Sequence, residues 1–314
     1  MVCPLEEFSL KIVDPPTCSE EGFLLGDLTS LRFQILALDL DGTLLDPQGL
    51  VAPETAVAIA RAVEAGILPV LCTGRRPRRT FPIARSLGLK TPIVCNSGAL
   101  IKTLDEQTLW RADWDRDLLH RVVDVFRRLD EPAISFIDRP GDQADFVVAT
   151  PRTGRPLFDD FLDQNRSFAE VAPGWAEEAD RVHFHLTAIG TREAMLTLEQ
   201  ALLENLEGRV QTFVQKSPSY AGTMCEVLRS DANKWTAIRQ LCAIWGVEPA
   251  QVCAVGDDMN DIPMLRGAGL GVAMGHASPE VRASAHRVTG TNRVGGVAQL
   301  INEILIRELD PHAN

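Results

Sequence analysis

The chain has 314 residues, of which 45% are hydrophobic and 24% charged, a composition typical of a globular enzyme, and its length exceeds that of a single hydrophobic core. The formal net charge of −12 disfavours a nucleic acid or an anionic membrane surface as a partner. The 7 cysteines are scattered without the close spacing of a zinc or redox motif, and no apolar run approaches the ~20 residues of a membrane-spanning helix, so we expect a reduced, cytoplasmic protein.

The most informative segment follows residues 1–32, whose weak periodicity predicts an irregular N-terminal extension. The apolar run 35–38 is typical of a buried strand in a parallel sheet, and two carboxylates, Asp39 and Asp41, follow it directly. Side chains alternate along a strand, so both acids point the same way at its carboxyl end, where open α/β sheets bind ligands. Two adjacent carboxylates repel each other, which favours a bound cation and an attack on phosphorus. For an isolated pair of this kind, however, a solvated Asp-Gly turn is the more common explanation, so partner residues elsewhere in the chain decide the matter.

Helices and strands then alternate along the chain. We expect a helix from Pro53 to Gly66, a strand at 67–72, a helix at 77–87 and a strand at 92–95. This alternation predicts a parallel sheet with right-handed crossovers. Thr73 and Gly74 follow the second of these strands, where a hydroxyl and free backbone N–H groups could hold phosphate oxygens. The alternative is an ordinary helix start beside a solvated Arg75.

The middle of the chain lacks this regular alternation. Helices are expected at 118–129 and 192–206, with strands at 146–149, 182–187 and 210–214. The alternation returns with a strand at 224–228, a helix at 234–245 and a strand at 252–255, followed by short pieces at 269–274 and 286–289 and a helix at 297–308. We therefore predict a doubly wound α/β core with an inserted α+β cap domain: 1–32 as extension, 33–99 and 218–314 as core, and 100–217 as cap.

A second acidic group follows the strand at 252–255. Asp257, Asp258 and Asp261 stand there with Asn260, and Mg²⁺ favours a few carboxylates completed by water and phosphate oxygens. Lys234, at the start of a predicted helix, could neutralise a phosphate. Each signal has an ordinary alternative, an acidic helix start or an exposed lysine, but all occur at the ends of βα units.

These motifs together resemble the haloacid dehalogenase superfamily, and within it the Cof-like phosphatases with a class IIB cap. The resemblance covers residues 34–308 and rests on DLDGTLLD at 39–46, TGR at 73–75, Lys234, and GDDMND at 256–261. It implies that Asp39 is the nucleophile that becomes phosphorylated, and that Asp41 protonates the leaving alcohol and later activates water. It also implies that Mg²⁺ is held by Asp39, the Asp41 carbonyl and Asp257.

The same resemblance implies a set of groups around the phosphate. Those expected to bind it are the Leu40 backbone, Thr73, Gly74, Lys234 and Asn260, and those expected in supporting positions are Asp261, Asp258 and Arg75. Three residues depart from the common pattern of the family: Trp235, Ser97 and His276. In the cap, His183 and His185 share one face of a predicted strand, where they could contact a substrate or a second metal or could simply be packed. Arg76, Arg78 and Arg79 are expected on a solvated helix face.

The function that these patterns predict is a Mg²⁺-dependent phosphatase acting on a small phosphorylated metabolite, with a sugar phosphate as the first choice. Two other readings stay open: a phosphomutase or specialised sugar-phosphate phosphatase on the same fold, and a catalytically silent protein that binds phosphometabolites. Neither a nucleic acid nor a membrane is expected as a partner, and the sequence does not predict the oligomeric state.

Overall fold

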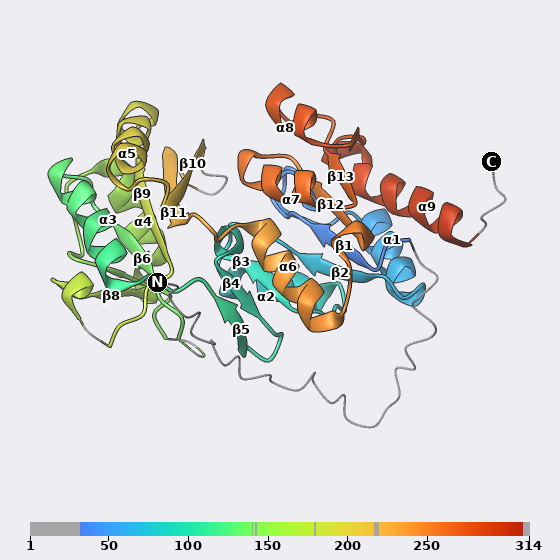
Figure 1. The fold of residues 1–314 in the computed structure, drawn as a ribbon, viewed down its shortest axis with the longest axis horizontal. Helices are drawn as coiled ribbons and strands as arrows, with labels where there is room; N and C mark the ends of the chain where they lie inside the picture. The colour runs from blue at the N-terminus through green and yellow to red at the C-terminus, as the bar shows by residue number, and fades with distance from the viewer. Residues whose placement is uncertain (1–31, 140, 142, 179, 217–219, 310–314) are drawn as a thin grey trace, which may run out of the picture.

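The computed structural model describes residues 32–309 except 140, 142, 179 and 217–219 (Figure 1). The expected N-terminal extension at 1–32 thus lies, apart from Arg32, outside the described residues. Within them, the core is a five-stranded sheet in the order β14-β13-β12-β1-β2, and every neighbouring pair is parallel. Its strands are β1 (Ile35–Leu38), β2 (Leu68–Leu71), β12 (Val252–Gly256), β13 (Leu270–Ala273) and β14 (Arg287–Val288).

Helices cover both faces of this sheet, as expected of a doubly wound fold. Apolar residues of α1 (Pro53–Glu64), α2 (Pro77–Ser86) and α9 (Gly296–Leu309) share one hydrophobic cluster with β1 and β12. Those of α6 (Lys234–Trp245) and α7 (Ile262–Gly267) share a second cluster with the opposite faces of the same strands. A short helix, α8 (Pro279–Ser284), packs against α7 and β13. The predicted α/β core is confirmed.

Strand β1 lies at the point where the strand order of the sheet reverses. It lies between β12 and β2, so the chain moves to one side of β1 early and returns to the other side after the cap. Ligands of open α/β sheets bind outside the carboxyl ends of the strands at such a reversal. The residues after β1 and β12 therefore lie side by side at this end of the sheet.

The cap is a separate layer beside the core, on the left of Figure 1. Its six strands, in the order β10-β11-β9-β6-β7-β8, pair antiparallel except for β7 with β8. They are β6 (Ile134–Phe136), β7 (Phe146–Val148), β8 (Ala169–Val171), β9 (His185–Gly190), β10 (Val210–Lys216) and β11 (Thr223–Arg229). Helices α3 (Arg116–Arg128), α4 (Pro156–Asn165) and α5 (Arg192–Asn205) pack with this sheet around a hydrophobic core of its own.

Both expected cap boundaries are shifted in the structure. Strand β11 was expected in the core, but it pairs antiparallel with β9 and β10, so the cap sheet continues to Arg229. At the other boundary, β3 (Ile93–Cys95), β4 (Leu100–Lys102) and β5 (Thr108–Arg111) form an antiparallel sheet attached to the core through a bridge between Cys72 and Val94. The expectation for β11 was wrong because β11 is followed by helix α6, and a strand followed by a helix suggests a βα unit of the core. The strands with which β11 pairs lie far away in the sequence, so the local pattern does not reveal them.

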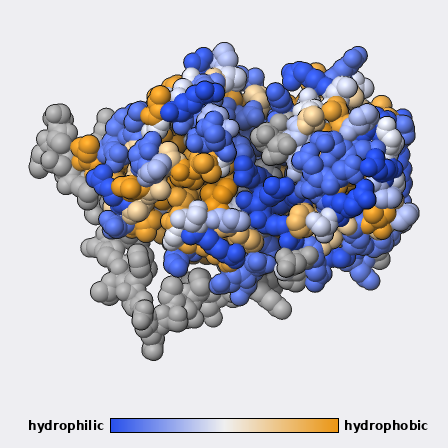
Figure 2. Space-filling view, turned by 180° about the vertical axis from the view of Figure 1, so that it is seen from behind, coloured by the Kyte–Doolittle hydropathy of each residue, from blue (hydrophilic) through white to orange (hydrophobic). Residues whose placement is uncertain are grey.

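The surface of the described residues is mainly polar. Seen from behind, hydrophilic residues cover most of the molecule, while hydrophobic residues gather in an area over the core (Figure 2). None of the helices in the described part of the chain is long and apolar enough to cross a membrane.

Candidate active site

The centre of the site is a buried lysine between two carboxylates. Asp39 follows β1 directly and is 5% exposed, and its Oδ1 accepts a hydrogen bond of 2.7 Å from Lys234 Nζ. Lys234 begins α6, is fully buried, and also donates to Asp261 Oδ1 at 2.6 Å. Burial raises the pKa of Asp39, and Lys234 opposes that rise. Burial lowers the pKa of Lys234, but Asp261 and Asp39 outweigh it, so the lysine keeps its proton.

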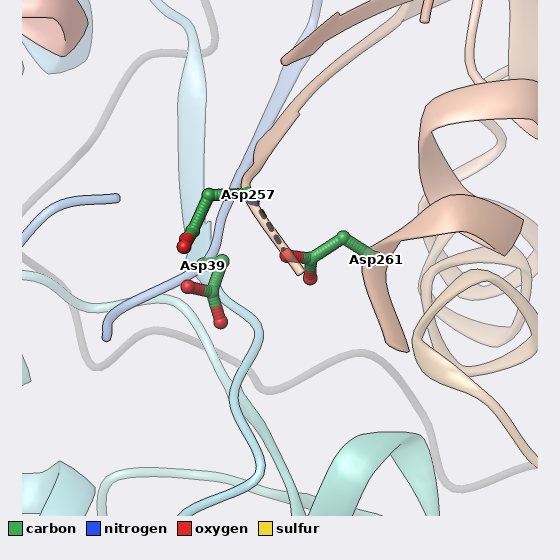
Figure 3. A group of neighbouring side chains, drawn as sticks. All are labelled: Asp39, Asp257 and Asp261. Carbon is green, nitrogen blue, oxygen red and sulfur yellow. Dashed lines mark hydrogen bonds between the residues drawn. The ribbon is translucent and has the colours of Figure 1, made fainter. Parts of the chain in front are cut away.

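Asp257 completes the acidic group from the end of β12. Its Oδ1 accepts a hydrogen bond of 2.7 Å from Thr43 Oγ1. Asp261 Oδ2 accepts from the backbone N–H of Asp257 at 2.8 Å and of Asp258 at 3.0 Å, the first of which is the dashed line in Figure 3. Asp261 thus supports both the lysine and the loop that carries Asp257. Burial, together with the charge of Asp261, raises the pKa of Asp257 to about 7.

This arrangement fits a divalent cation. Carboxylate oxygens of Asp39, Asp257 and Asp261 lie within 4.8 Å of one another (Figure 3). Lys234 and two backbone amides already occupy Asp261, whereas among the described residues the Asp257 carboxylate accepts a hydrogen bond through Oδ1 from the Thr43 hydroxyl. Burying carboxylates together is costly unless a cation compensates them, and hard oxygen donors suit Mg²⁺. The donors present therefore fit the expected metal.

Asp41, close to this group in the sequence, forms an ion pair with Arg75. The guanidinium donates from Nε to Asp41 Oδ2 at 2.7 Å and from Nη2 to Oδ1 at 2.5 Å, and both side chains are about one-quarter exposed. Such a two-pronged contact fixes a carboxylate in one plane. The structure therefore places Arg75, expected in a supporting position, on Asp41.

The expected phosphate-binding residues converge on one loop region. Thr73 is buried, and its Oγ1 accepts from the Arg75 backbone N–H at 3.1 Å. A Cβ added at Gly74 would lie 3.8 Å from Asn260 Nδ2, so the TGR loop and the loop after β12 are in close proximity. Leu40 buries its side chain in the core, and its carbonyl accepts from the backbone N–H groups of Thr43 and Leu45, so the expected role in phosphate binding rests with its own N–H.

Asp258 lies apart from this convergence. Its side chain is exposed and accepts from the Met259 N–H at 2.7 Å, which caps the turn Met259–Asp261. Within the described residues, the contacts of the Asp258 side chain are those of a helix cap.

Two residues that contribute to the region were absent from the sequence expectations. Thr43 orients Asp257, and Glu226 of β11 is 3% exposed with its Oε2 2.5 Å from Ser97 Oγ. Burial raises the pKa of Glu226 to about 7. A glutamate within the run Met224–Leu228, whose other residues are apolar, is a signal that could have revealed it, since buried acids usually have a partner.

The two cap histidines are packed inside the cap. His185 stacks on Phe136 with ring centroids 4.8 Å apart, and burial lowers its pKa to about 3. His183 precedes β9, its Nδ1 lies 2.6 Å from Ser135 Oγ, and burial lowers its pKa to about 4. These contacts favour neutral packed rings, the second of the two readings that the sequence left open.

The remaining departures from the family pattern have distinct environments. The ring of Trp235 packs closely against Gly267 of α7: a Cβ added at Gly267 would lie 2.2 Å from the indole. The contact is between helices of the core. His276 Nε2 lies 3.7 Å from Asp257 Oδ2, beside the acidic group. Arg76, expected in solvent, is 7% exposed and pairs with Asp145 of the cap.

The fold and this site together define the class of protein. The family model described as haloacid dehalogenase-like hydrolase matches residues 36–301, and the chain belongs to this family. The sequence is 29% identical over 287 residues to pyridoxal phosphate phosphatase YbhA of Escherichia coli, covering 87% of this chain and 99% of that protein. It is 28% identical over 252 residues to the HMP-PP phosphatase of Serratia proteamaculans, covering 80% and 87%.

Solved structures agree with the family. A haloacid dehalogenase-like hydrolase from Bacillus subtilis matches with a TM-score of 0.69 at 26% identity, covering 86% of this chain and 99% of that one. The subclass IIB sugar phosphatase BT4131 shares the fold with a TM-score of 0.70 at 21% identity, covering 87% and 99%. The resemblance inferred from the motifs is confirmed, and the chain is placed among the phosphatases of the family.

Proposed function

We propose that the chain is a Mg²⁺-dependent phosphatase that hydrolyses a small phosphorylated metabolite through a phosphorylated Asp39. The observation that carries the proposal is the buried Asp39, bound through Oδ1 alone to Lys234 among the described residues. Its second oxygen stays available as a nucleophile. A lysine that keeps its charge there offsets part of the negative charge of the nucleophile and of an arriving phosphate.

The proposed hydrolysis has two steps: transfer of the phosphoryl group to Asp39, and hydrolysis of the phosphorylated aspartate. Asp39 Oδ2 forms a bond to phosphorus while the bond to the leaving oxygen breaks, and Asp41 gives that oxygen a proton. A water molecule then attacks phosphorus, Asp41 takes its proton, and the Asp39–phosphorus bond breaks to release phosphate. Arg75 holds the Asp41 carboxylate in one orientation through two hydrogen bonds. The first step requires Arg75 to move from Asp41 when the substrate enters.

The expected metal has a clear place in this scheme. A Mg²⁺ ion held by Asp39 and Asp257 would supply positive charge to the phosphoryl oxygens. Thr43 and the backbone contacts of Asp261 hold Asp257 in position for that role. Gly74, Thr73 and Asn260 would hold the remaining oxygens through N–H and O–H donors.

The substrate class is proposed as a small phosphate ester bound between core and cap. The relatives above are named for pyridoxal phosphate, for HMP-PP and for sugar phosphates, which are all small phosphorylated compounds. We place sugar phosphates first in a panel and pyridoxal phosphate second.

The test is phosphate release by the full-length protein over that panel with Mg²⁺. We expect turnover that EDTA abolishes and Mg²⁺ restores, and no turnover in Asp39→Asn. Asp105→Asn, in an exposed turn, serves as the matched control and keeps full activity. Turnover by Asp39→Asn would refute the nucleophile. Isomerised product without released phosphate would favour a mutase, and no turnover of any ester would favour a silent binding protein.

A further inference from the structure

Ser97 joins the cap to the core through a single hydroxyl. It follows β3, is fully buried, and adopts φ 55°, the left-handed region in which glycine is favoured. The hydroxyl is therefore held at a position where a side chain is strained.

Two buried partners share this hydroxyl. Ser97 Oγ donates to Glu226 Oε2 over 2.5 Å and accepts from Asn260 Nδ2 over 3.4 Å. Glu226 belongs to β11 of the cap sheet, and Asn260 belongs to the loop after β12 of the core. Both are at most 5% exposed. A cap residue and a core residue are thus connected through one serine.

The connection lies directly against the expected phosphate loop. A Cβ added at Gly74 would lie 3.2 Å from Ser97 Oγ, 3.5 Å from Glu226 Oε1 and 3.8 Å from Asn260 Nδ2. Any change in the orientation of these groups therefore occurs next to the backbone that would hold a phosphate.

The direction of the two hydrogen bonds of Ser97 determines how the Asn260 amide is oriented. A hydroxyl has one proton, and because Glu226 accepts it, a lone pair of Ser97 is left to face Asn260. That lone pair accepts one N–H of the Asn260 amide and leaves the second N–H for another acceptor. Without Glu226 the hydroxyl could rotate and donate to the amide oxygen instead, which would favour the flipped amide.

We propose that Ser97 and Glu226 are positioning residues that couple the seating of the cap to the orientation of the phosphate-binding amide of Asn260. This inference rests on the proposed function, since it assigns Asn260 to phosphate. When the cap is seated, Glu226 fixes the hydroxyl and the amide points a donor at the phosphate. When the cap lifts, Glu226 leaves and the amide loses its orientation.

The experiment is a double-mutant cycle on phosphate affinity, measured by calorimetry with inorganic phosphate and Mg²⁺ on the full-length chain. Ser97→Ala and Glu226→Ala should each weaken binding by about three- to tenfold, the loss of one hydrogen bond. The double variant should bind no more weakly than either single variant. Glu226→Gln, whose amide oxygen still accepts from Ser97, should bind nearly as well as the wild type.

Ser86→Ala is the matched serine control, because its hydroxyl is exposed and bonds only within α2, to the Ile83 carbonyl. Ser97→Gly separates positioning from structure: it removes strain, so the melting temperature should hold or rise while phosphate affinity falls. Equal affinity in all variants, additive losses, or no phosphate binding by the wild type would overturn the proposal. Coupled losses in a protein that hydrolyses no ester would leave this connection standing and refute the proposed function.

Discussion

At the scale of single residues, the buried Lys234 is the main electrostatic element of the site. It is the only lysine shown here between two buried carboxylates, Asp39 and Asp261, in the described part of the chain. Removing one partner of a buried ion pair leaves an uncompensated charge. Lys234→Met should therefore lower the free energy of unfolding by about 3–5 kcal/mol and abolish turnover, as denaturant titration and phosphate release can show.

Lys102→Met provides the control for this substitution. Lys102 is also buried and pairs with Asp138 at 2.8 Å, outside the acidic group. It should destabilise the protein while phosphate binding persists. Adding Asp261→Asn to Lys234→Met should recover part of the stability. A Lys234→Met protein as stable as the wild type would contradict this account.

The buried Glu226 should make the stability of the protein depend on pH. Burial raises its pKa to about 7 in the folded protein, whereas the unfolded value is near 4.5. Between these pH values the folded state binds the proton more tightly, so this residue's contribution to stability is present at low pH and is lost as pH rises. Compared with Glu226→Gln, the wild type should lose on the order of 2–3 kcal/mol between pH 5 and pH 8.

Denaturant titrations of the two proteins at both pH values measure this difference, and other titrating groups cancel because both proteins have them. A difference that is constant with pH would show that Glu226 is not desolvated in the folded protein.

At the scale of elements, the loop after β1 is shaped by Gly42. Its φ is +88°, and an added Cβ would lie 2.2 Å from Asp257 Oδ2. Gly42→Ala should therefore displace Asp257 and weaken Mg²⁺ binding by about tenfold or more, as expected for disturbed support of a metal ligand. Titration of Mg²⁺ by calorimetry measures the loss.

Gly49 in the same loop region provides a matched control. It has φ +79° and no atom within 4 Å of an added Cβ, so Gly49→Ala carries the same backbone strain without the clash. If both variants lost Mg²⁺ affinity equally, strain rather than the position of Asp257 would be responsible.

The elements also show what the sequence could predict. The buried strands β1 and β12 and the start of α6 at Lys234 were predicted, because apolar runs, turn residues and helix ends are local signals. The placement of β11 was wrong, because its antiparallel partners β9 and β10 are a matter of long-range pairing. Within the site, the convergence of Asp39 and Asp257 followed from the ends of β1 and β12, whereas the role of Lys234 was implied by the resemblance to the family.

The contacts that local pattern could not reveal are those between separate segments. The pairing of Arg75 with Asp41 and of Ser97 with Glu226 depends on how loops approach one another in space. Arg76 reads as one more charge in an arginine-rich helix start, and only the position of the cap explains its burial.

At the scale of the whole molecule, the start of α2 holds the cap against the core. Arg76 Nη1 donates to Asp145 Oδ2 at 3.0 Å, and Arg76 Nη2 donates to Asn165 Oδ1 at 2.5 Å. Arg78 Nε also donates to Asp145, at 3.1 Å. Asp145 immediately precedes β7, so one carboxylate of the cap receives two arginines of the core. These contacts hold the cap closed against the core at the start of α2.

Asp145→Asn should loosen this closure by about 1–2 kcal/mol, since a hydrogen bond to a charged group is lost at a half-buried position. Arg78 keeps its contact with the Gln143 carbonyl, so we expect partial opening rather than separation. Hydrogen exchange of backbone amides should become faster in α2 and β7. The KM for a bulky phosphate ester should rise by a larger factor than the Kd for inorganic phosphate. Asp163→Asn, which breaks exposed ion pairs within the cap, should change neither quantity. Unchanged exchange in Asp145→Asn would mean that the cap is held to the core by other contacts, such as that between Ser97 and Glu226.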